Sequence, residues 1–145
     1  EMLRDAEAMD LVQEVYKNSD IFMPGVSELK MITGMETVED AVKKAFEDNS
    51  GLELLVLKNG SKGSRLYTRN GLEEVMGIYP VEQVDATGAG DSYDAAFICG
   101  LAEGRSLKEA AQMGAAAGAL NAAAFGPMEG DISRETVMGM IEKHK

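Results

Sequence analysis

The chain has 145 residues, 45% of them hydrophobic and 27% charged, so it is long enough to bury one hydrophobic core. Its formal net charge is −11, and no local basic stripe interrupts the excess of acidic residues. Such a surface repels polyanions, which argues against nucleic acid as a partner. Because the longest apolar runs fall short of the roughly 20 residues that span a bilayer, we expect no membrane segment.

Cysteine usage and the N-terminal residues bear on the compartment. The single cysteine, Cys99, excludes an intrachain disulfide and favours a reducing compartment. Its place in an apolar run predicts a buried thiol rather than a nucleophile. The sequence does not open with the basic-then-apolar pattern of a signal peptide. We therefore expect a cytoplasmic protein.

The first third of the chain predicts alternating helices and strands. Apolar residues at near-helical spacing indicate an amphipathic helix over residues 2–18, and the run 20–24, stopped by Pro-Gly, indicates a buried strand. A short helix over 27–34 precedes a longer one over 37–48. The nearly continuous apolar run 52–57 is typical of a strand covered on both faces in a parallel sheet.

The middle of the chain predicts a hairpin. Residues 64–69 and 72–79 are two strand-like runs joined by Asn70-Gly71, a dipeptide favoured in tight type I′ turns. We expect this antiparallel hairpin at the edge of the sheet. A short apolar run over 81–84 then leads into a glycine-rich turn.

Three helices complete the pattern. They are predicted over 92–101, from the capping box at Ser106 to about residue 124, and from Ser133 to about residue 144. The alternation of strands and helices predicts a single α/β domain over residues 1–145. It would have three layers, with a mainly parallel sheet flanked by helices. Ligands of such sheets bind at the carboxyl ends of the strands.

The segment Asp-Ala-Thr-Gly-Ala-Gly-Asp, residues 85–91, carries the chemistry. Gly88 and Gly90 permit unusual dihedrals, so successive amides at the helix N-terminus can face an anion such as phosphate. Fixed amide donors stabilise the charge that spreads over a phosphoryl group during transfer. Asp91 can take the proton of an acceptor hydroxyl, or it can simply cap the helix.

Residues 85–97, Asp-Ala-Thr-Gly-Ala-Gly-Asp-Ser-Tyr-Asp-Ala-Ala-Phe, resemble the C-terminal signature of ribokinase-like carbohydrate kinases. That family includes ribokinase, fructokinases, 2-keto-3-deoxygluconate kinases and adenosine kinase. Residues 20–34 resemble its strand with an Asn-x-x-Glu element, and residues 52–63 resemble its strand with a Thr-x-Gly-x-x-Gly turn. The resemblance covers essentially the whole chain and implies a ribokinase-like fold.

The resemblance implies a catalytic role for the glycine-rich turn. Asp91 resembles the family's general base. Gly88, Ala89 and Gly90 resemble its anion hole for the transferred phosphate. Asp94, one helical turn further on, either belongs to a substrate hydroxyl network or faces solvent.

The resemblance also implies nucleotide and metal contacts. Glu28 resembles the glutamate that organises Mg²⁺ through water, and Asp85 resembles part of a monovalent-cation site, which makes K⁺ a candidate helper. Gly60 and Gly63 resemble the turn that approaches the nucleotide, and the region Asn121 to Gly126 resembles the adenine-side wall.

Two positions depart from the family pattern. Gly25 replaces the asparagine of Asn-x-x-Glu, which removes a polar side chain near the metal. Lys58 replaces the first threonine of the turn, and it either contacts a nucleotide phosphate or lies exposed at a strand end. Glu28 is likewise either metal-associated or a solvated helix residue.

We therefore expect ATP-dependent phosphotransfer, with Mg²⁺, to a hydroxyl of a sugar or sugar acid. Ser92-Tyr93-Asp94 resembles the hexose and sugar-acid members more than the nucleoside kinases. The family's sugar-binding Asp and Gly-Gly elements and its β lid belong to an N-terminal half that residues 1–145 do not match. The alternative is a truncated or divergent chain that binds nucleotide, or keeps only the fold, and acts by association. The sequence leaves open whether the chain forms a homo-oligomer.

Overall fold

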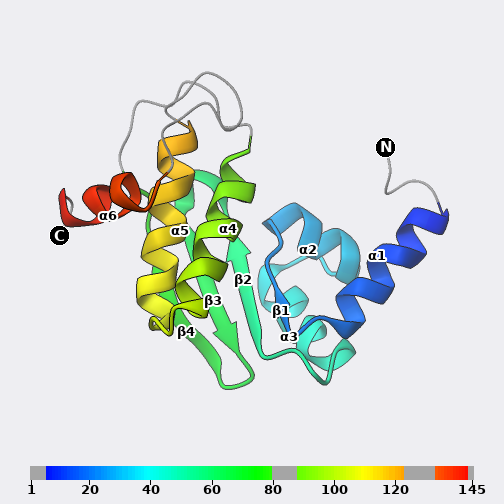
Figure 1. Cartoon of the computed structure of the whole chain (residues 1–145). Helices are drawn as coiled ribbons and strands as arrows, with labels where there is room; N and C mark the ends of the chain where they lie inside the picture. The colour runs from blue at the N-terminus through cyan, green and yellow to red at the C-terminus, as the bar shows by residue number, and fades with distance from the viewer. Residues whose placement is uncertain (1–5, 80–87, 123–132, 144–145) are drawn as a thin grey trace. The chain divides into compact units, whose positions relative to one another are not determined.

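The computed structural model describes residues 6–79, 88–122 and 133–143 (Figure 1). Contacts divide the chain into two compact units. The first contains Glu1–Asn59 and Arg65–Glu73, and the second contains Gly60–Ser64 and Glu74–Lys145. The prediction of one domain over residues 1–145 stays a prediction. Among the described helices, none is both long and apolar enough to cross a membrane.

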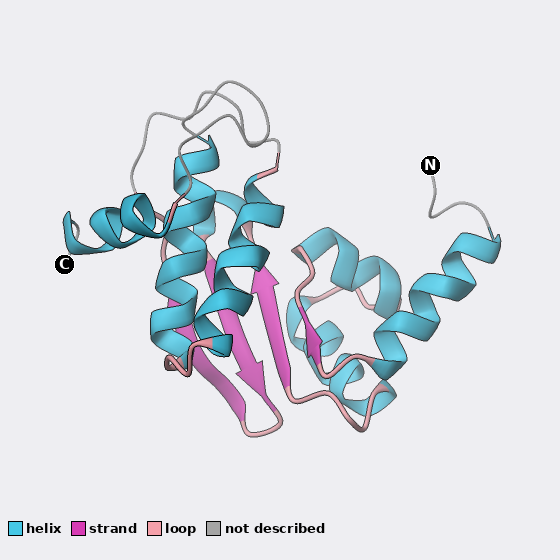
Figure 2. Cartoon of the chain, viewed as in Figure 1, coloured by secondary structure: helices cyan, strands magenta, loops and turns pink. Residues whose placement is uncertain are grey.

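The strands form a mixed sheet, drawn in magenta in Figure 2, with the order β1-β2-β3-β4. The pair β1–β2 is parallel, with Ile21 opposite Leu54 and Phe22 opposite Leu55. Short connections make the remaining neighbours antiparallel, since a parallel pair needs a crossover of a dozen residues or more. The bounds of the four strands are β1 Ile21–Phe22, β2 Leu54–Lys58, β3 Ser64–Thr68 and β4 Gly71–Met76.

The helices of the first unit end where the sequence signals predict. They are α1 (Ala6–Asn18), α2 (Val26–Thr33) and α3 (Val38–Asp48). The second begins at Val26, one residue before the predicted start at Ser27, and residues 2–5 of the first predicted helix lie outside the described residues. Gly34 ends α2 in the left-handed conformation, with φ +73°, and Thr37 caps α3 by accepting a hydrogen bond from the Asp40 amide at 3.2 Å. The predicted helices over 27–34 and 37–48 are therefore confirmed.

Strand β2 is the most buried strand of the first unit. Leu55 and Val56 have no exposed surface, and Leu54 and Leu57 are at most 5% exposed. Successive side chains of a strand point to opposite faces, so both faces of β2 are covered, as its continuous apolar sequence predicts. The core around it is formed by Tyr16, Leu29, Ala41, Ala45, Leu52, Leu55 and Leu57.

The predicted hairpin is present, but its turn is shifted by one residue. The two connecting residues are Arg69 and Asn70, and Gly71 is already the first residue of β4. Gly71 has a φ of +116°, which a glycine adopts without strain. The positive φ is thus used where the chain enters β4 instead of in the centre of the turn. As predicted, the order of strands places the hairpin at one edge of the sheet.

The second unit contains η2 (Gly60–Lys62), α4 (Ala89–Ala102), α5 (Leu107–Ala122) and α6 (Arg134–Lys143). Ser106 and Glu109 form the predicted capping box, with the Glu109 amide 3.1 Å from the Ser106 hydroxyl oxygen. Figure 1 shows α4 and α5 side by side. Their contact is close at Gly100, where an added methyl group would lie only 3.0 Å from the Cα of Ala110.

The prediction that Cys99 is buried is wrong, because its side chain is exposed on α4. The buried residues Tyr93, Phe97 and Gly100 are spaced by four and three positions, so they form one stripe of the helix. Cys99 and its neighbour Ile98, which is 44% exposed, lie off that stripe. The apolar run around Cys99 therefore does not require burial of every member.

Asn49 joins several parts of the first unit. Its side-chain nitrogen donates to the carbonyls of Tyr16 and Ser19 at 3.0 and 2.6 Å, and its side-chain oxygen accepts from the Gly51 amide at 3.0 Å. The Arg69 guanidinium donates to the Asn49 carbonyl at 2.6 Å. Asn49 is only 3% exposed, and its bond to the Tyr16 carbonyl is buried, whereas the bonds with Ser19, Gly51 and Arg69 are partly buried.

We expect Asn49→Ala to destabilise the protein by about 1–3 kcal/mol, because it leaves buried carbonyl and amide groups without partners. The matched control is Asn18→Ala. Asn18 is exposed and donates to the Glu14 carbonyl within its own helix, so its loss should change stability by less than about 0.5 kcal/mol. Urea unfolding at constant slope measures both differences. Equal losses would show that the Asn49 bonds contribute no more than a surface contact.

Candidate functional site

The N-terminus of α4 is built as an anion site requires. Gly88 is the N-cap residue, with a left-handed φ of +85°, and the first helical bond joins the Ser92 amide to the Gly88 carbonyl at 2.9 Å. The amides of Ala89, Gly90 and Asp91 precede that bond and have no acceptor within the helix. Three consecutive N–H groups at the positive end of a helix dipole can therefore face an anion.

The helix begins three residues before the predicted start at residue 92, and this difference matters for Asp91. Asp91 is the third residue of α4, with its side chain exposed. Because Gly88 holds the N-cap position, Asp91 is not the N-cap residue. The role of its carboxylate as a general base stays a prediction.

Two buried hydrogen bonds attach the start of α4 to its surroundings. The Ser92 hydroxyl donates to the side-chain oxygen of Asn121 on α5 at 3.2 Å, and the hydroxyls of Tyr93 and Ser64 are 2.8 Å apart. All four residues are less than 10% exposed. Asn121, predicted to belong to the adenine-side wall, thus lies behind the first turn of α4. Its contact with a nucleotide stays a prediction.

Glycines on α5 bring it close to the same turn. A methyl group at Gly114 would lie 3.0 Å from the Tyr93 ring, and one at Gly118 would lie 3.3 Å from the Ala89 carbonyl oxygen. At contacts this short, a side chain at either position would require the neighbouring atoms to shift by a few tenths of an ångström. The first turn of α4 is therefore held by α5 through direct packing as well as through hydrogen bonds.

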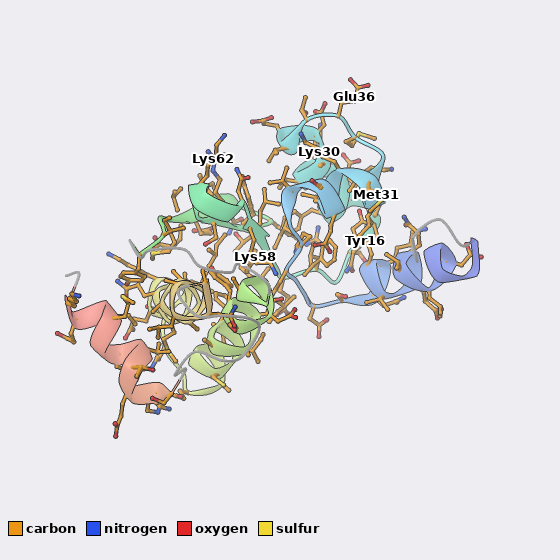
Figure 3. The ribbon with its side chains drawn as sticks, turned by 90° about the horizontal axis from the view of Figure 1, so that it is seen from above. Tyr16, Lys30, Met31, Glu36, Lys58 and Lys62 are labelled. Atoms are coloured by element: carbon orange, nitrogen blue, oxygen red, sulfur yellow. The ribbon has the colours of Figure 1, made fainter. Side chains whose placement is uncertain are left out.

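The predicted nucleotide turn forms the short helix η2, on which Figure 3 shows Lys62. The Gly63 amide donates to the Gly60 carbonyl at 3.1 Å, which closes the turn. A methyl group at Gly63 would lie 2.0 Å from the Met76 carbonyl oxygen, so packing against β4 requires glycine there. Gly60, with φ +50°, has open space in front of it, and a ligand can approach its backbone.

In the first unit, the carboxyl ends of β1 and β2 bring Gly25, Glu28 and Lys58 together. Gly25 forms an isolated parallel bridge with Lys58, the last residue of β2, which Figure 3 labels. The Gly25 amide donates to the Glu28 carboxylate at 3.4 Å. Glu28 is exposed and Lys58 is half-buried. Three of the positions that the sequence singles out therefore share one edge of the parallel pair.

Metal-binding capacity in the described residues rests on single carboxylates, since no group of three His, Cys, Asp or Glu side chains lies together there. Mg²⁺ is commonly held by one or two carboxylates together with substrate phosphates and water. The exposed carboxylate of Glu28 fits that role as an oxygen donor. The other predicted cation residue, Asp85, and the wall residue Gly126 lie outside the described residues.

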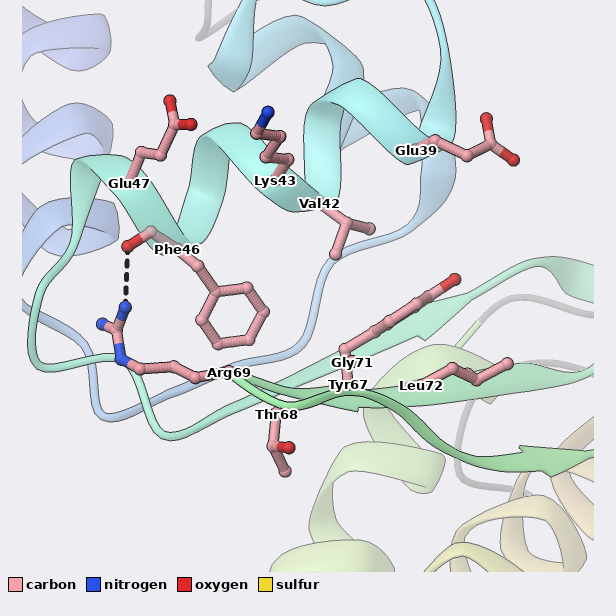
Figure 4. A pocket seen from close by; sticks show the side chains of 10 residues that line it. All are labelled: Glu39, Val42, Lys43, Phe46, Glu47, Tyr67, Thr68, Arg69, Gly71 and Leu72. Carbon is pink, nitrogen blue, oxygen red and sulfur yellow. Dashed lines mark hydrogen bonds between the residues drawn. The ribbon is translucent and has the colours of Figure 1, made fainter.

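A hollow of about 510 Å³ lies elsewhere in the first unit, between α3 and the β3–β4 hairpin (Figure 4). Arg69 borders it, donating to the Phe46 carbonyl at 3.0 Å with its guanidinium 5.4 Å from the centre of the Phe46 ring. None of the residues predicted for phosphate transfer lines this hollow, so it is separate from the candidate site. Its lining consists of Glu39, Val42, Lys43, Phe46, Glu47, Tyr67, Thr68, Arg69, Gly71 and Leu72.

The Tyr93–Ser64 pair is the part of the site that sequence reasoning missed. Tyr93 stands two residues after Asp91, and Ser64 directly follows Gly63, so each was visible beside a predicted site residue. The tyrosine itself was the available signal, because a buried tyrosine usually has a hydrogen-bond partner. The two partners are 29 positions apart, which hides the pairing from any local pattern.

Burial raises the pKa of the Tyr93 phenol above its ordinary value; the nearby Asp94 charge adds to this, and the Ser64 hydrogen bond opposes it. Tyr93 is therefore neutral at physiological pH and can donate or accept in its bond with Ser64. The hydroxyl pair does not depend on ionisation in the ordinary pH range.

We expect this raised pKa to affect how the free energy of unfolding depends on pH in the alkaline range. In the unfolded chain the phenol ionises near pH 10, whereas in the folded protein it keeps its proton above that pH. The contribution of the Tyr93 phenol to the free energy of unfolding is therefore complete below about pH 10. It is lost as pH rises toward the pKa of the phenol in the folded protein. The unfolding free energy of Tyr93→Phe should therefore fall less steeply above about pH 10 than that of the wild type. Parallel pH profiles would contradict the assignment.

Taken together, the fold and the turn define an α/β protein in which a helix begins at a glycine-rich turn and carries an exposed aspartate in its first turn. The family model of the pfkB family carbohydrate kinases matches residues 2–133. The chain belongs to this family, and its fold is ribokinase-like.

Individual relatives agree with this assignment. The chain is 32% identical to a ribokinase of Arabidopsis thaliana and 31% identical to a 5-dehydro-2-deoxygluconokinase of Clostridium perfringens, over 97% and 90% of its own length. It covers 39% of each of these relatives. A crystal structure of a putative ribokinase II of E. coli, in complex with ATP and Mg²⁺, is 32% identical, with a TM-score of 0.90 over 99% of this chain and 46% of that one.

Proposed function

We propose that this chain provides the ATP-binding and phosphate-transferring part of a kinase that acts on a hydroxyl of a sugar or sugar acid. The observation that carries the proposal is the first turn of α4, where three amides without a helical acceptor adjoin the exposed Asp91. Membership of a carbohydrate kinase family supports the reaction type. The relatives named for ribose and for a deoxygluconate support the acceptor class.

In the proposed reaction, the acceptor hydroxyl oxygen attacks the terminal phosphorus of ATP. A new oxygen–phosphorus bond forms, the bond from that phosphorus to the bridging oxygen breaks, and ADP leaves. Asp91 takes the hydroxyl proton as the new bond forms, an effect usually worth roughly 10²–10⁴-fold in rate. The amides of Ala89, Gly90 and Asp91 stabilise the charge on the transferred group without reorganising.

The other residues of the proposed donor site have separate roles. Gly60, with open space before its backbone, and the region from Asn121 to Gly126 would contact the nucleotide. Glu28 would organise Mg²⁺, which neutralises phosphate charge when bound, and Asp85 would contribute to K⁺ binding. The E. coli neighbour with ATP and Mg²⁺ supports the nucleotide and the metal.

Because the chain has a net charge of −11, the proposed site must attract phosphate through short-range interactions. A field of that sign opposes the approach of a polyphosphate. Binding must therefore depend on short-range backbone dipoles and on cations that accompany the nucleotide. Lys58, half-buried at the end of β2, is a candidate for one further phosphate contact.

A second candidate function is nucleotide binding without transfer. It is favoured by Gly25, which provides no side chain beside Glu28. Under this alternative, the amides at the start of α4 still bind phosphate, but no acceptor is phosphorylated.

We expect Asp91→Asn to lower phosphoryl transfer by about 10²–10⁴-fold in the full-length natural polypeptide, with nucleotide affinity little changed, because the amide side chain cannot take the proton. Steady-state kinetics with ATP and a panel of sugars and sugar acids measures the rate. Calorimetric titration with ATP and Mg²⁺ measures the affinity.

The matched control is Asp40→Asn. Asp40 is likewise exposed and is the third residue of its helix, α3, so it has the same relation to a helix dipole. Asp40→Asn should leave turnover unchanged. Unchanged turnover in Asp91→Asn would remove the base assignment, and nucleotide binding by a wild type without transfer to any acceptor would favour the second function.

A further inference from the structure

The Ser64–Tyr93 hydrogen bond connects two elements of the proposed donor site. Ser64 directly follows the Gly60–Gly63 turn, and Tyr93 lies two residues after Asp91 on α4. Their hydroxyl oxygens are 2.8 Å apart, with Ser64 3% and Tyr93 7% exposed. Both elements belong to the second unit, so the bond spans the interior of a single compact body.

The turn side of this connection has little freedom. The Gly63 amide is bonded to the Gly60 carbonyl, and the position of a Gly63 methyl group is occupied by the Met76 carbonyl. Ser64 continues from Gly63 directly into β3. If the Ser64 side chain were displaced, the turn and the beginning of β3 would therefore move with it.

The helix side is equally restricted. The Tyr93 ring contacts the backbone position of Gly114, and it stacks on Phe97 with 6.1 Å between ring centres and an angle of 11°. Gly118 contacts the Ala89 carbonyl in the same first turn. The position of the Tyr93 hydroxyl is thus fixed relative to the first turn of α4.

We propose that the Ser64–Tyr93 bond fixes the distance between the Gly60–Gly63 turn and the amides of Ala89 to Asp91, so that both contact one nucleotide. The turn then contacts the nucleoside portion while the amides hold the terminal phosphates. Ser64 and Tyr93 are assigned as positioning residues because both side chains are buried. This inference rests on the proposed function.

An ordinary core hydrogen bond would stabilise the fold without setting this distance, and the two roles differ in ligand selectivity. Inorganic tripolyphosphate has no nucleoside, so it engages only the helix amides. ATP must engage the turn and the amides together. A bond that sets their spacing matters for ATP and not for tripolyphosphate, whereas a bond that only stabilises the helix matters equally for both.

The test is calorimetric titration of this chain with ATP and with tripolyphosphate, each with Mg²⁺, for the wild type, Tyr93→Phe, Ser64→Ala and the double variant. Tyr93→Phe keeps the ring that packs on Gly114, so the fold is retained, and far-ultraviolet circular dichroism verifies this. The matched control is Tyr67→Phe, because Tyr67 is a half-buried tyrosine of β3 in the first unit.

We expect ATP affinity to fall about three- to tenfold in each single variant, which corresponds to the loss of one hydrogen bond. The double variant should be no weaker than the singles, because both substitutions remove the same interaction. Tripolyphosphate affinity in every variant, and ATP affinity in Tyr67→Phe, should remain within about twofold of the wild type.

Three results would overturn the inference. Unchanged ATP affinity in Tyr93→Phe would show that the bond does not set the spacing, and the donor site would stand. Equal losses for ATP and tripolyphosphate would assign the bond a purely structural role. Failure of the wild type to bind ATP would remove the proposed function and this inference with it.

Discussion

The close packing of α4 on α5 is the constraint on which the candidate site depends. Gly114 and Gly118 are one helical turn apart on α5, and they contact the Tyr93 ring and the Ala89 carbonyl of α4. A side chain at either glycine would require the Tyr93 ring or the Ala89 carbonyl, and thus the first turn of α4, to shift by a few tenths of an ångström. The buried Ser92–Asn121 bond joins the same two helices. The direction in which the first-turn amides point is thus determined by a neighbouring helix.

A separate constraint acts in the first unit, where the parallel pair β1–β2 ends. Parallel strands direct their carboxyl ends to the same edge, and for that reason Gly25, Glu28 and Lys58 meet although more than 30 residues separate the first from the last. Glu28, the third residue of α2, turns back toward the amide of the N-cap residue Gly25, as in a capping box. A carboxylate held this weakly, at 3.4 Å, remains able to turn toward a hydrated cation.

Local sequence signals predicted most element boundaries, whereas the details of the site depend on long-range contacts. Gly34, Thr37 and Ser106 ended or began helices as expected because caps act within four residues. Cys99 was wrongly predicted to be buried, since an apolar run does not specify which stripe of the helix faces inward. The Ser64–Tyr93 pair was missed because its partners are 29 residues apart.

Under the proposed function, the first turn of α4 would combine both requirements of phosphoryl transfer in three consecutive residues. Its amides suit the phosphate and its carboxylate suits the proton, and their mutual geometry is set by helix dihedrals that any α-helix adopts. The acceptor takes no part in that geometry, so one such turn can serve acceptors of different structure. Relatives named for ribose and for a deoxygluconate, each about 30% identical to this chain, agree with that separation. Under the proposed function, selection of the acceptor would therefore depend on residues outside this turn.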